Sequence, residues 1–350
     1  MGKVIEIADQ QVGAGYPCFI IAEAGVNHNG NLKTAKRLVD AAVSAGANAV
    51  KFQTFVAEQV ISPIAPQADY QLKNTGKDES QLEMVQRLEL SVDDHHQLQS
   101  YCQQKNILFL STPFDQKSVD LLDQLNVPAY KIGSGEITNW PLLEYIAQKG
   151  KPIILSTGMS NLSEVEEAVG VLQNTGNNQI ILMHCVSNYP ADPADVNLRA
   201  MLTMEKTFQV PVGYSDHTLG IEVPLAAVAL GACVIEKHFT LDRTMPGPDH
   251  RASLEPEFLK AMVSGIRIVE QSLGHGRKEP AASELDTARA ARRSLVAAQD
   301  ISKGTVIEER HIDIKRPGTG LSPQMIDKII GQKAIENIKE GSLIKLEMLS

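Results

Sequence analysis

The sequence lacks the features that mark nucleic-acid-binding, membrane and secreted proteins. Its 350 residues carry a net charge of −9, with no basic excess for a nucleic-acid surface. The longest apolar stretch, VPLAAVALGACVI, is too short to cross a bilayer, and the opening MGKVIEIADQ has no apolar signal-peptide core. We therefore expect a cytoplasmic protein that binds neither nucleic acid nor membranes.

Cysteine pairs and dinucleotide-binding motifs are also missing. The four cysteines form no CxxC pair and lie mostly in apolar runs, which indicates buried free thiols in a reducing compartment. No GxGxxG motif follows any strand-like run, and this disfavours a doubly wound dinucleotide-binding sheet. If the substrate is an anion, the positive charge that binds it must be concentrated in a pocket.

What the sequence does contain is a regular alternation of β-rich apolar runs with segments of helical periodicity. The eight runs cover residues 19–25, 49–55, 107–114, 129–136, 152–159, 180–185, 211–217 and 233–239. Apolar strands separated by helices are typical of a parallel sheet covered on both faces. Eight such units match a (β/α)8 barrel, which takes about 250 residues. We predict a TIM barrel over residues 1–273, opened by a hairpin.

Polar side chains stand at or just past the end of every run. They are Glu23; Lys51 and Gln53; Ser111 and Thr112; Lys131, Ser134 and Glu136; Ser156 and Thr157; His184 and Ser187; Ser215 and His217; and His238. The carboxyl ends of all eight strands meet at one mouth of a parallel barrel, where the active site forms. In that position Glu23 could orient a substrate hydroxyl or move a proton.

His217 and His238 end successive strand-like runs, 21 positions apart in the sequence. A histidine taken alone is more often a packing residue, but these two are expected on one rim of the barrel. Two neutral imidazoles with open remaining positions suit a catalytic divalent ion that also accepts a substrate oxygen. We predict a shared metal site at these residues.

Lys51 and Lys131 lie within apolar runs, where a solvated surface position is a poor explanation. One interpretation is a Schiff-base lysine of an aldolase. The other is a pair of cationic anchors for a phosphate, helped by neighbouring hydroxyl groups. The hydroxyls of Thr112, Ser134, Ser156, Ser187 and Ser215 favour the anion site.

The composition changes after residue 273. Residues 274–292 are polar and are interpreted as a linker. Residues 293–350 contain a weak repeat, DISKGTVI at 300–307 and NIKEGSLI at 337–344, with Gly304 and Gly341 at equivalent positions. This pattern predicts a small, pseudo-symmetric, mostly β module. A Gly/Pro loop, KRPGTG, presents Arg316 between the two repeats.

Eight short motifs carry a family resemblance. They are AEAGVNHNG, VKFQTF, STPFD, YKIGSGE, LSTGM, GYSDHTLG, EKHFTLD and GPDH. In this order they closely resemble the sialic acid synthases, enzymes that use phosphoenolpyruvate to make N-acetylneuraminate and related nonulosonic acids. The resemblance covers nearly the whole chain, because the tail with KRPGTG is similar to the antifreeze-like (SAF, β-clip) domain of that family.

The resemblance implies a role for each matching residue. His217 and His238 would hold Mn²⁺ or Mg²⁺, with Glu136 beside the water of the metal. Phosphoenolpyruvate would be bound by Lys51, Thr112, Lys131, Ser134, Ser156, Ser187 and Ser215. The sugar would face Glu23, Gln53, Asn74, Tyr189 and Asp249. In the family the loop that contains Arg316 closes the active site of the other subunit, which implies a domain-swapped homodimer.

The implied reaction condenses phosphoenolpyruvate with an open-chain N-acylated hexosamine and releases phosphate. With N-acetylmannosamine the product would be N-acetylneuraminate. With 2,4-diacetamido-2,4,6-trideoxymannose it would be N,N'-diacetyllegionaminate, and the sequence does not decide between the two. A Schiff-base aldolase that uses Lys131 remains an alternative. An ice-binding tail is rejected, because KRPGTGLSPQMIDKIIGQ is charged and irregular.

Overall fold

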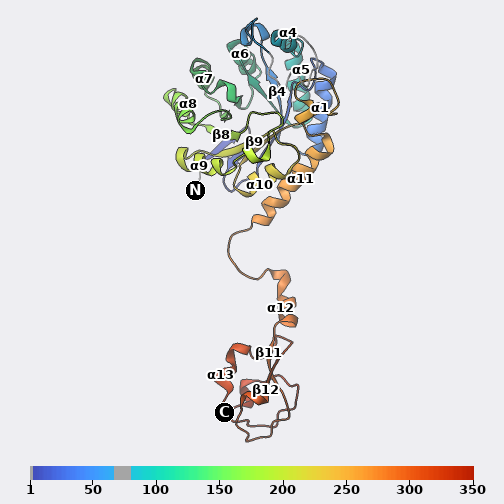
Figure 1. Cartoon of the computed structure of the whole chain (residues 1–350), viewed down its shortest axis with the longest axis vertical. Helices are drawn as coiled ribbons and strands as arrows, with labels where there is room; N and C mark the ends of the chain where they lie inside the picture. Colours follow the sequence, from blue (N-terminus) through green and yellow to red (C-terminus); the bar gives the residue numbers. More distant parts are fainter. Residues whose placement is uncertain (1–2, 67–79) are drawn as a thin grey trace. The chain divides into compact units, whose positions relative to one another are not determined.

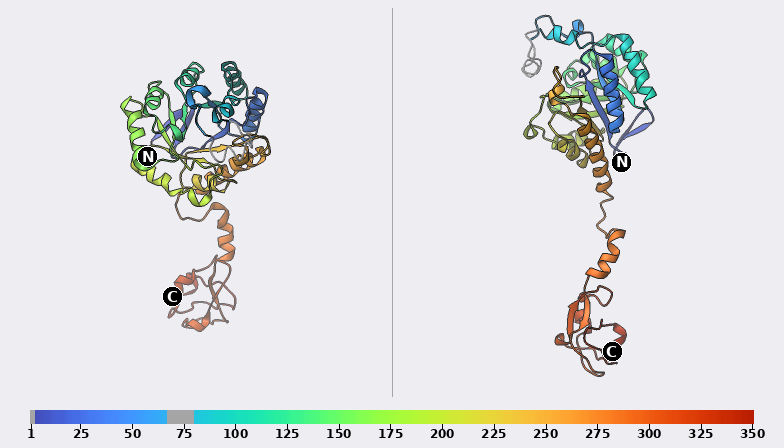
Figure 2. Two further views of the ribbon diagram at one scale, coloured as in Figure 1. Left: turned by 45° about the horizontal axis from the view of Figure 1, so that its top comes forward. Right: turned by 90° about the vertical axis from the view of Figure 1, so that its right-hand side faces the viewer.

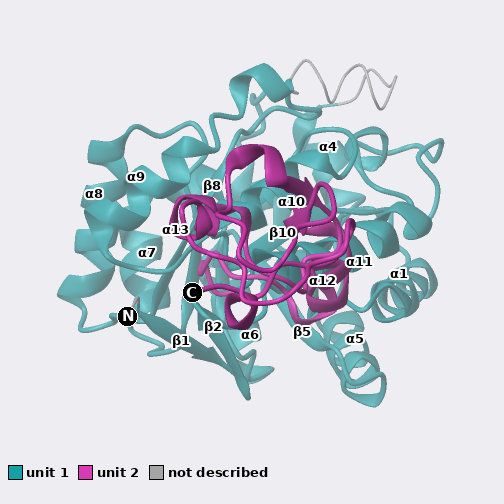
Figure 3. Cartoon of the chain, turned by 90° about the horizontal axis from the view of Figure 1, so that it is seen from below, with its two compact units in different colours: residues 1–274 teal, residues 275–350 magenta. Residues whose placement is uncertain are grey.

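The computed structural model describes residues 3–66 and 80–350. The chain opens with the expected hairpin, in which β1 (Val4–Ile7) and β2 (Gln10–Gly13) pair antiparallel. Strands then alternate with helices as predicted (Figure 1). The chain divides into two compact units, Met1–Gly274 and His275–Ser350, coloured separately in Figure 3.

The first unit is a parallel barrel. Its strands are β3 (Phe19–Gly25), β4 (Ala49–Thr54), β5 (Leu108–Pro113), β6 (Tyr130–Ile132), β7 (Ile153–Ser156), β8 (Ile180–Cys185), β9 (Val212–Asp216) and β10 (Val234–His238). Their hydrogen-bonded order is β5-β4-β3-β10-β9-β8-β7-β6. The two ends of this order, β5 and β6, are in contact, so the sheet closes into a nearly complete barrel (Figure 2). This confirms the predicted (β/α)8 architecture.

Helices surround the strands. They are α1 (Leu32–Ala45), α2 (Ala57–Val60), α4 (Gln81–Gln86), α5 (Val92–Gln104), α6 (Gln116–Gln124), α7 (Trp140–Ala147), α8 (Leu162–Asn174), α9 (Arg199–Phe208), α10 (Glu222–Ala229) and α11 (Pro256–Leu273). Several begin at a polar side chain that accepts a backbone N–H, as Asn31, Asp115 and Asn161 do for α1, α6 and α8. Such caps start each helix soon after its strand and keep the strand-to-helix turn short.

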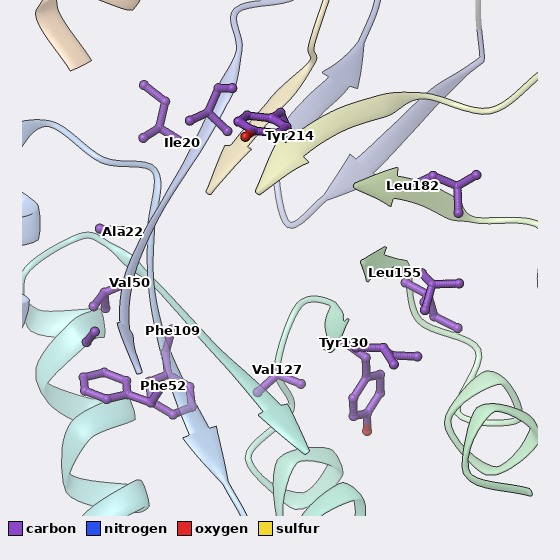
Figure 4. Close-up of a cluster of buried hydrophobic side chains, with 14 of the residues drawn as sticks. Ile20, Ala22, Val50, Phe52, Phe109, Val127, Tyr130, Leu155, Leu182 and Tyr214 are labelled. Carbon is purple, nitrogen blue, oxygen red and sulfur yellow. The ribbon is translucent and has the colours of Figure 1, made fainter. Parts of the chain in front are cut away.

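Successive residues of each strand face opposite sides of the barrel wall. One set packs outward against the helices and forms the large core of Figure 4, with Ile20, Ala22, Val50, Phe52, Leu182 and Tyr214 among its members. The alternate set contributes to a second apolar cluster, which includes Phe19, Ile21, Ile154, Ile181 and Val234. Side chains of the opening hairpin, Ile5, Ile7 and Val12, belong to this same cluster. The amino-terminal half of the barrel interior is therefore filled with apolar side chains.

The second unit contains α12 (Leu285–Ala291), β11 (Ser294–Ala297), β12 (Ile312–Lys315) and α13 (Ile326–Ile329). The two predicted repeats pair with each other, because Ile301 and Ile338 exchange backbone hydrogen bonds of 2.8 Å. Gly304 and Gly341 both adopt positive φ, of 92° and 77°, as the turns of the repeat require. Helix α12 lies within residues 274–292, the segment interpreted as a linker. The Ala- and Arg-rich sequence there favours a helix.

Within residues 3–66 and 80–350, no helix is both long enough and apolar enough to cross a bilayer.

Candidate active site

The two-residue period of the strands places polar side chains above the apolar filling of the barrel. On β10, for example, Val234 belongs to the interior apolar cluster, so Glu236 and His238 follow on the same side of the strand. On β4, Ala49 is followed in the same way by Lys51 and Gln53. The carboxyl ends of these parallel strands therefore deliver charged groups to the mouth, as the sequence predicted.

A cavity of about 470 Å³ opens at this mouth. Its lining includes twelve of the predicted site residues: Glu23, Lys51, Gln53, Thr112, Lys131, Ser134, Ser156, Ser187, Tyr189, Ser215, His217 and His238. Four other polar strand-end residues, Ser111, Glu136, Thr157 and His184, are absent from the described lining. Ser111 instead hydrogen-bonds Thr54, at an Oγ–Oγ distance of 2.7 Å.

Both predicted lysines are buried and paired with polar groups. Lys51 Nζ lies 2.9 Å from Glu23 Oε2 and donates to Thr112 Oγ1 at 2.9 Å. Lys131 Nζ donates to Ser156 Oγ at 2.7 Å. Burial lowers the pKa of Lys131, whereas the carboxylates of Glu23 and Glu236 outweigh the effect of burial and raise the pKa of Lys51. The two ammonium groups therefore occupy the same cavity in different electrostatic surroundings.

Glu236 is a charged residue of the cavity that was not predicted from the sequence. Its Oε1 lies 3.5 Å from Lys131 Nζ and 3.8 Å from Lys51 Nζ, and it accepts a hydrogen bond of 3.1 Å from Ser215 Oγ. Burial alone would raise the pKa of Glu236, but the two ammonium groups outweigh burial and hold it below its usual range. Alternation from His238 was the signal that could have found it, because residues i and i+2 of a strand share a face.

Glu23 has a different electrostatic setting from Glu236. Burial raises the pKa of Glu23 to about 7, against the opposing effect of Lys51. Gln53 Nε2 donates to its Oε1 at 3.3 Å. A carboxyl group with a pKa near neutrality can hold or release a proton at the mouth of the barrel.

The two predicted metal ligands lie side by side. The ring centroids of His217 and His238 are 5.5 Å apart, and the Tyr189 ring lies 4.2 Å from the ring of His217. Nδ1 of His217 donates to Val186 O at 2.7 Å, which leaves Nε2 of the neutral ring with a lone pair. Nδ1 of His238 is buried and has no hydrogen-bonding partner among the described residues. Burial lowers the pKa of both rings.

These imidazoles fit a divalent ion, because burial favours the neutral form of both rings and both residues line the cavity. No cluster of three or more His, Cys, Asp or Glu side chains suited to a metal occurs in the part of the chain that the structure describes. The protein would therefore supply two ligands, and the remaining positions would stay open for oxygen atoms of water or substrate.

Ser134 and Ser187, two of the hydroxyl-bearing residues of the cavity, lie close to the backbone of Gly158. The N–H of Gly158 donates to Ser134 Oγ at 2.8 Å, and Ser134 Oγ lies 3.1 Å from Cys185 Sγ. A Cβ on Gly158 would lie 2.3 Å from Ser187 Oγ and 2.9 Å from Ser134 Oγ. A side chain at position 158 would therefore collide with both serine hydroxyls, and glycine avoids this collision.

A second cavity, of about 220 Å³, adjoins the first and shares Gln53, Phe114, Tyr189 and His238 with it. Asp249, predicted to face the sugar, lines this second cavity rather than the first. Its side chain is buried, and burial raises its pKa to about 6.

Three predicted residues are not among those lining the two cavities. Glu136 follows the short strand β6 in a 3-10 turn, and its Oε2 accepts a hydrogen bond of 2.7 Å from Asn139. Arg316 belongs to the second unit, on an exposed loop held by Ser294, whose Oγ donates to Pro317 O at 2.6 Å. Asn74 lies outside the described residues.

Known proteins share this architecture along most of the chain. Residues 38–278 match the NeuB family and residues 292–350 match the SAF domain. N,N'-diacetyllegionaminic acid synthase of Campylobacter jejuni is 52% identical over 93% of this chain and 98% of its own. Human N-acetylneuraminate-9-phosphate synthase is 37% identical over 97% of this chain and 94% of its own. The crystal structure of N-acetylneuraminic acid synthetase from Leptospira borgpetersenii, in complex with citrate, superposes with a TM-score of 0.73 and 40% identity, covering 82% of this chain and 95% of that one. The chain belongs to the NeuB family and carries a C-terminal SAF domain.

Proposed function

We propose that the chain condenses phosphoenolpyruvate with the aldehyde of an open-chain N-acylated amino sugar, giving a nonulosonic acid and inorganic phosphate. One observation carries this proposal. A single cavity of about 470 Å³ is lined by two buried lysines, several hydroxyls and two neutral imidazoles. The names of the C. jejuni and human relatives, both synthases of nonulosonic acids, support the same reaction.

The lysine side of the cavity suits phosphoenolpyruvate. Lys51 and Lys131 provide two ammonium groups for its phosphate and carboxylate, and charge-assisted hydrogen bonds of this kind are the strong ones. The hydroxyls that already bond these lysines, of Thr112 and Ser156, are placed to contact the same anion. Ionised Glu236 keeps the two lysines charged before the anion binds.

The reaction forms a bond between C3 of phosphoenolpyruvate and C1 of the sugar. Positive charge then develops at C2, water adds there, and the tetrahedral intermediate expels phosphate. Fixing two small reactants against each other lowers the barrier by about 7–11 kcal/mol, so positioning groups account for much of the catalysis. Glu23, with its pKa of about 7, is suited to move a proton to the new hydroxyl or from the water.

His217 and His238 would hold Mn²⁺ or Mg²⁺, and the bound ion would polarise the aldehyde oxygen. The protein's own contribution here is to keep both imidazoles neutral and fixed. His217→Ala should abolish Mn²⁺ binding measured by electron paramagnetic resonance, as well as activity. The matched change His96→Ala, at a histidine with an exposed side chain, should leave Mn²⁺ binding unchanged. Undiminished binding in His217→Ala would rule out the two-histidine site.

The test of the proposed reaction is phosphate release that requires both substrates. Lys131→Met should raise the KM for phosphoenolpyruvate far more than the KM for the sugar, because it removes a charge-assisted contact. Lys117→Met, at an exposed lysine, is the control and should change neither. An effect of Lys131→Met confined to the sugar KM would show that Lys131 does not bind phosphoenolpyruvate.

Of the two sugars that the sequence left open, we favour 2,4-diacetamido-2,4,6-trideoxymannose. The relative that is 52% identical makes N,N'-diacetyllegionaminic acid by its name, whereas the human relative is 37% identical. N-acetylmannosamine is the second candidate. Mass spectrometry of the product separates them.

We also propose that the enzyme works as a homodimer in which Arg316 of one chain closes the site of the other. The loop around Arg316 is well anchored for such a task, because Gly320 N–H donates to Ser294 Oγ at 2.9 Å and Gly318 N–H donates to Arg289 O at 2.7 Å. The planar guanidinium suits an acyl carbonyl or hydroxyls.

Four free, buried cysteines support a cytoplasmic location.

A further inference from the structure

The two cavities at the barrel mouth differ in charge and in the side chains that line them. The larger one holds the lysines and hydroxyls described above. The smaller one, called the annex here, is lined mainly by apolar side chains, namely Val26, Phe55, Val60, Ile61, Met84, Val85, Leu88, Phe114 and Pro248, with Gln53, Gln81, Tyr189, His238 and Asp249 as its polar members. No lysine or arginine is among these described lining residues. The described lining therefore divides into a compartment with two lysines and a compartment without a cation, in which apolar side chains are the majority.

The two compartments meet at the residues that face the reacting aldehyde. Gln53, Phe114, Tyr189 and His238 line both. A sugar whose C1 lies at His238, with phosphoenolpyruvate on the lysine side, must direct the rest of its carbon chain away from the lysines. The annex is the adjoining cavity in which the far end of the sugar can lie.

The wall of the annex is built from ordered secondary structure. Met84 and Val85 lie on α4, which starts with a capping box between Ser80 and Glu83. The backbone N–H of Ala57, the first residue of α2, donates to the carboxylate of Glu89. The Phe55 and Phe114 rings meet edge-to-face at 6.3 Å. These contacts give the apolar wall a defined shape, which selectivity between similar sugars requires.

We infer that the annex is a specificity site for an uncharged, methyl-terminated sugar end, so that the enzyme selects N-acylated 6-deoxy sugars and rejects sugars phosphorylated at that end. This inference rests on the proposed condensation and names its sugar class. Apolar walls favour the C6 methyl and the methyl of a second acyl group. A phosphate would meet the buried carboxyl of Asp249 and no cation among the described lining residues. A hydroxymethyl end would place a hydroxyl against a lining in which nine of the fourteen described residues are apolar.

The first test compares sugars on the wild-type, full-length enzyme. The kcat/KM is measured by phosphate release from phosphoenolpyruvate with 2,4-diacetamido-2,4,6-trideoxymannose, with N-acetylmannosamine and with N-acetylmannosamine 6-phosphate. One apolar group in a fitted pocket changes kcat/KM by about 10- to 200-fold, so we expect at least that loss for N-acetylmannosamine and a greater loss for the phosphate. Equal or better use of either hexosamine would overturn the inference while leaving the condensation intact. Phosphate release with none of the sugars would overturn both.

The second test changes the annex itself at Val85, which lines it from α4. Val85→Thr replaces a methyl with a hydroxyl and should lower kcat/KM for the deoxy sugar about 10-fold, with the KM for phosphoenolpyruvate unchanged. Val85→Lys adds a cation and should improve use of the 6-phosphate relative to N-acetylmannosamine by about 10-fold or more. A relative gain of this kind cannot result from misfolding.

The same two substitutions at Val92 are the matched controls, because its side chain is exposed on α5 and lines neither cavity. Val92→Thr and Val92→Lys should leave the order of the three sugars unchanged. If the Val85 variants shift the sugar preference no more than the Val92 variants, the annex does not hold the sugar end.

Discussion

Glu236 lies between the two lysines that are proposed to bind phosphoenolpyruvate, with its carboxylate within 4 Å of both. A carboxylate there repels an anionic substrate, so its benefit must come from its effect on the lysines. Burial lowers the pKa of Lys131, and the largest opposing influence on it is Glu236. We propose that Glu236 opposes the effect of burial and favours the protonated form of Lys131.

This role predicts a change in pH dependence for Glu236→Gln. Lysine loses its proton as pH rises, so without the carboxylate the pKa of Lys131 falls further and binding of phosphoenolpyruvate should be lost at lower pH. In a profile of kcat/KM for phosphoenolpyruvate against pH, the decline on the alkaline side should therefore begin about one pH unit or more lower than in the wild type. Glu167→Gln, an exposed carboxylate on α8, should leave the profile in place. An unchanged decline on the alkaline side in Glu236→Gln would contradict the proposed role.

Among single residues, most of the polar side chains at or just past the strand ends lie where the sequence predicts them, at the mouth of the barrel. His217, His238, Lys51 and Lys131 all line the cavity as expected. Glu136 is not among the lining residues: β6 ends at Ile132, and in the 3-10 turn that follows Ser134 lines the cavity whereas Glu136 hydrogen-bonds Asn139. Polar composition shows that a run ends, but only backbone geometry shows which way the last side chain points.

At the scale of elements, β9 and β10 are joined behind the two histidines by a fully buried ion pair. Lys237 Nζ contacts Asp216 Oδ2 and the carbonyl oxygen of Thr218. Asp216 Oδ1 also accepts hydrogen bonds from Tyr214 Oη at 3.0 Å and from Thr218 N at 3.0 Å. Asp216 directly precedes His217 and Lys237 directly precedes His238, so this pair fixes the strand ends that carry the two histidines.

Removing one partner of this ion pair should lower the free energy of unfolding of the barrel unit. Lys237→Met leaves the Asp216 carboxylate buried without its cation, which typically costs about 3–5 kcal/mol of unfolding free energy. Urea unfolding followed by fluorescence of Trp140, the single tryptophan and a residue of the barrel unit, measures the loss. Lys105→Met, which breaks the exposed pair with Asp40, should cost about 1 kcal/mol or less. A Lys237→Met barrel as stable as the Lys105→Met barrel would refute this account.

The strands, the helices and their arrangement were the part of the structure that the sequence predicted best. Eight β-rich runs alternating with helices admit few architectures, since parallel strands need covered faces and right-handed crossovers. The carboxyl ends of the strands then had to share one mouth. The annex was not predicted, because its wall combines α2, α4 and residues near Asp249, and no local pattern in the sequence brings those segments together.

The whole molecule consists of a barrel unit and a SAF unit. The two units supply different parts of the proposed active site. The barrel unit supplies both cavities. The SAF unit supplies Arg316 on a loop fixed by Ser294. The proposed exchange of this loop between two chains makes each site composite, and a composite site can be rebuilt from two different inactive chains.

Mixed dimers test this exchange. Arg316→Ala and His217→Ala chains should each have little activity alone. After subunit exchange, a mixed dimer contains one site with both native residues, so activity should recover to about one quarter of wild type, since random mixing makes half of all dimers mixed and each has one good site of two. Exchange is verified with two differently tagged chains. No recovery in a verified mixture would show that Arg316 does not act on the partner's barrel.

The central claim, that phosphoenolpyruvate itself is condensed with loss of phosphate from C2, is tested most directly by isotope tracing. Phosphoenolpyruvate labelled with ¹⁸O in the oxygen that bridges C2 and phosphorus is incubated with the enzyme, Mn²⁺ and 2,4-diacetamido-2,4,6-trideoxymannose. Because water adds at C2 and the C–O bond breaks, the label should leave in inorganic phosphate, and the product should have the mass of an unlabelled nonulosonic acid. Label retained in the product or in pyruvate would contradict the account. So would turnover of pyruvate with borohydride trapping at Lys131, the result expected of a Schiff-base aldolase.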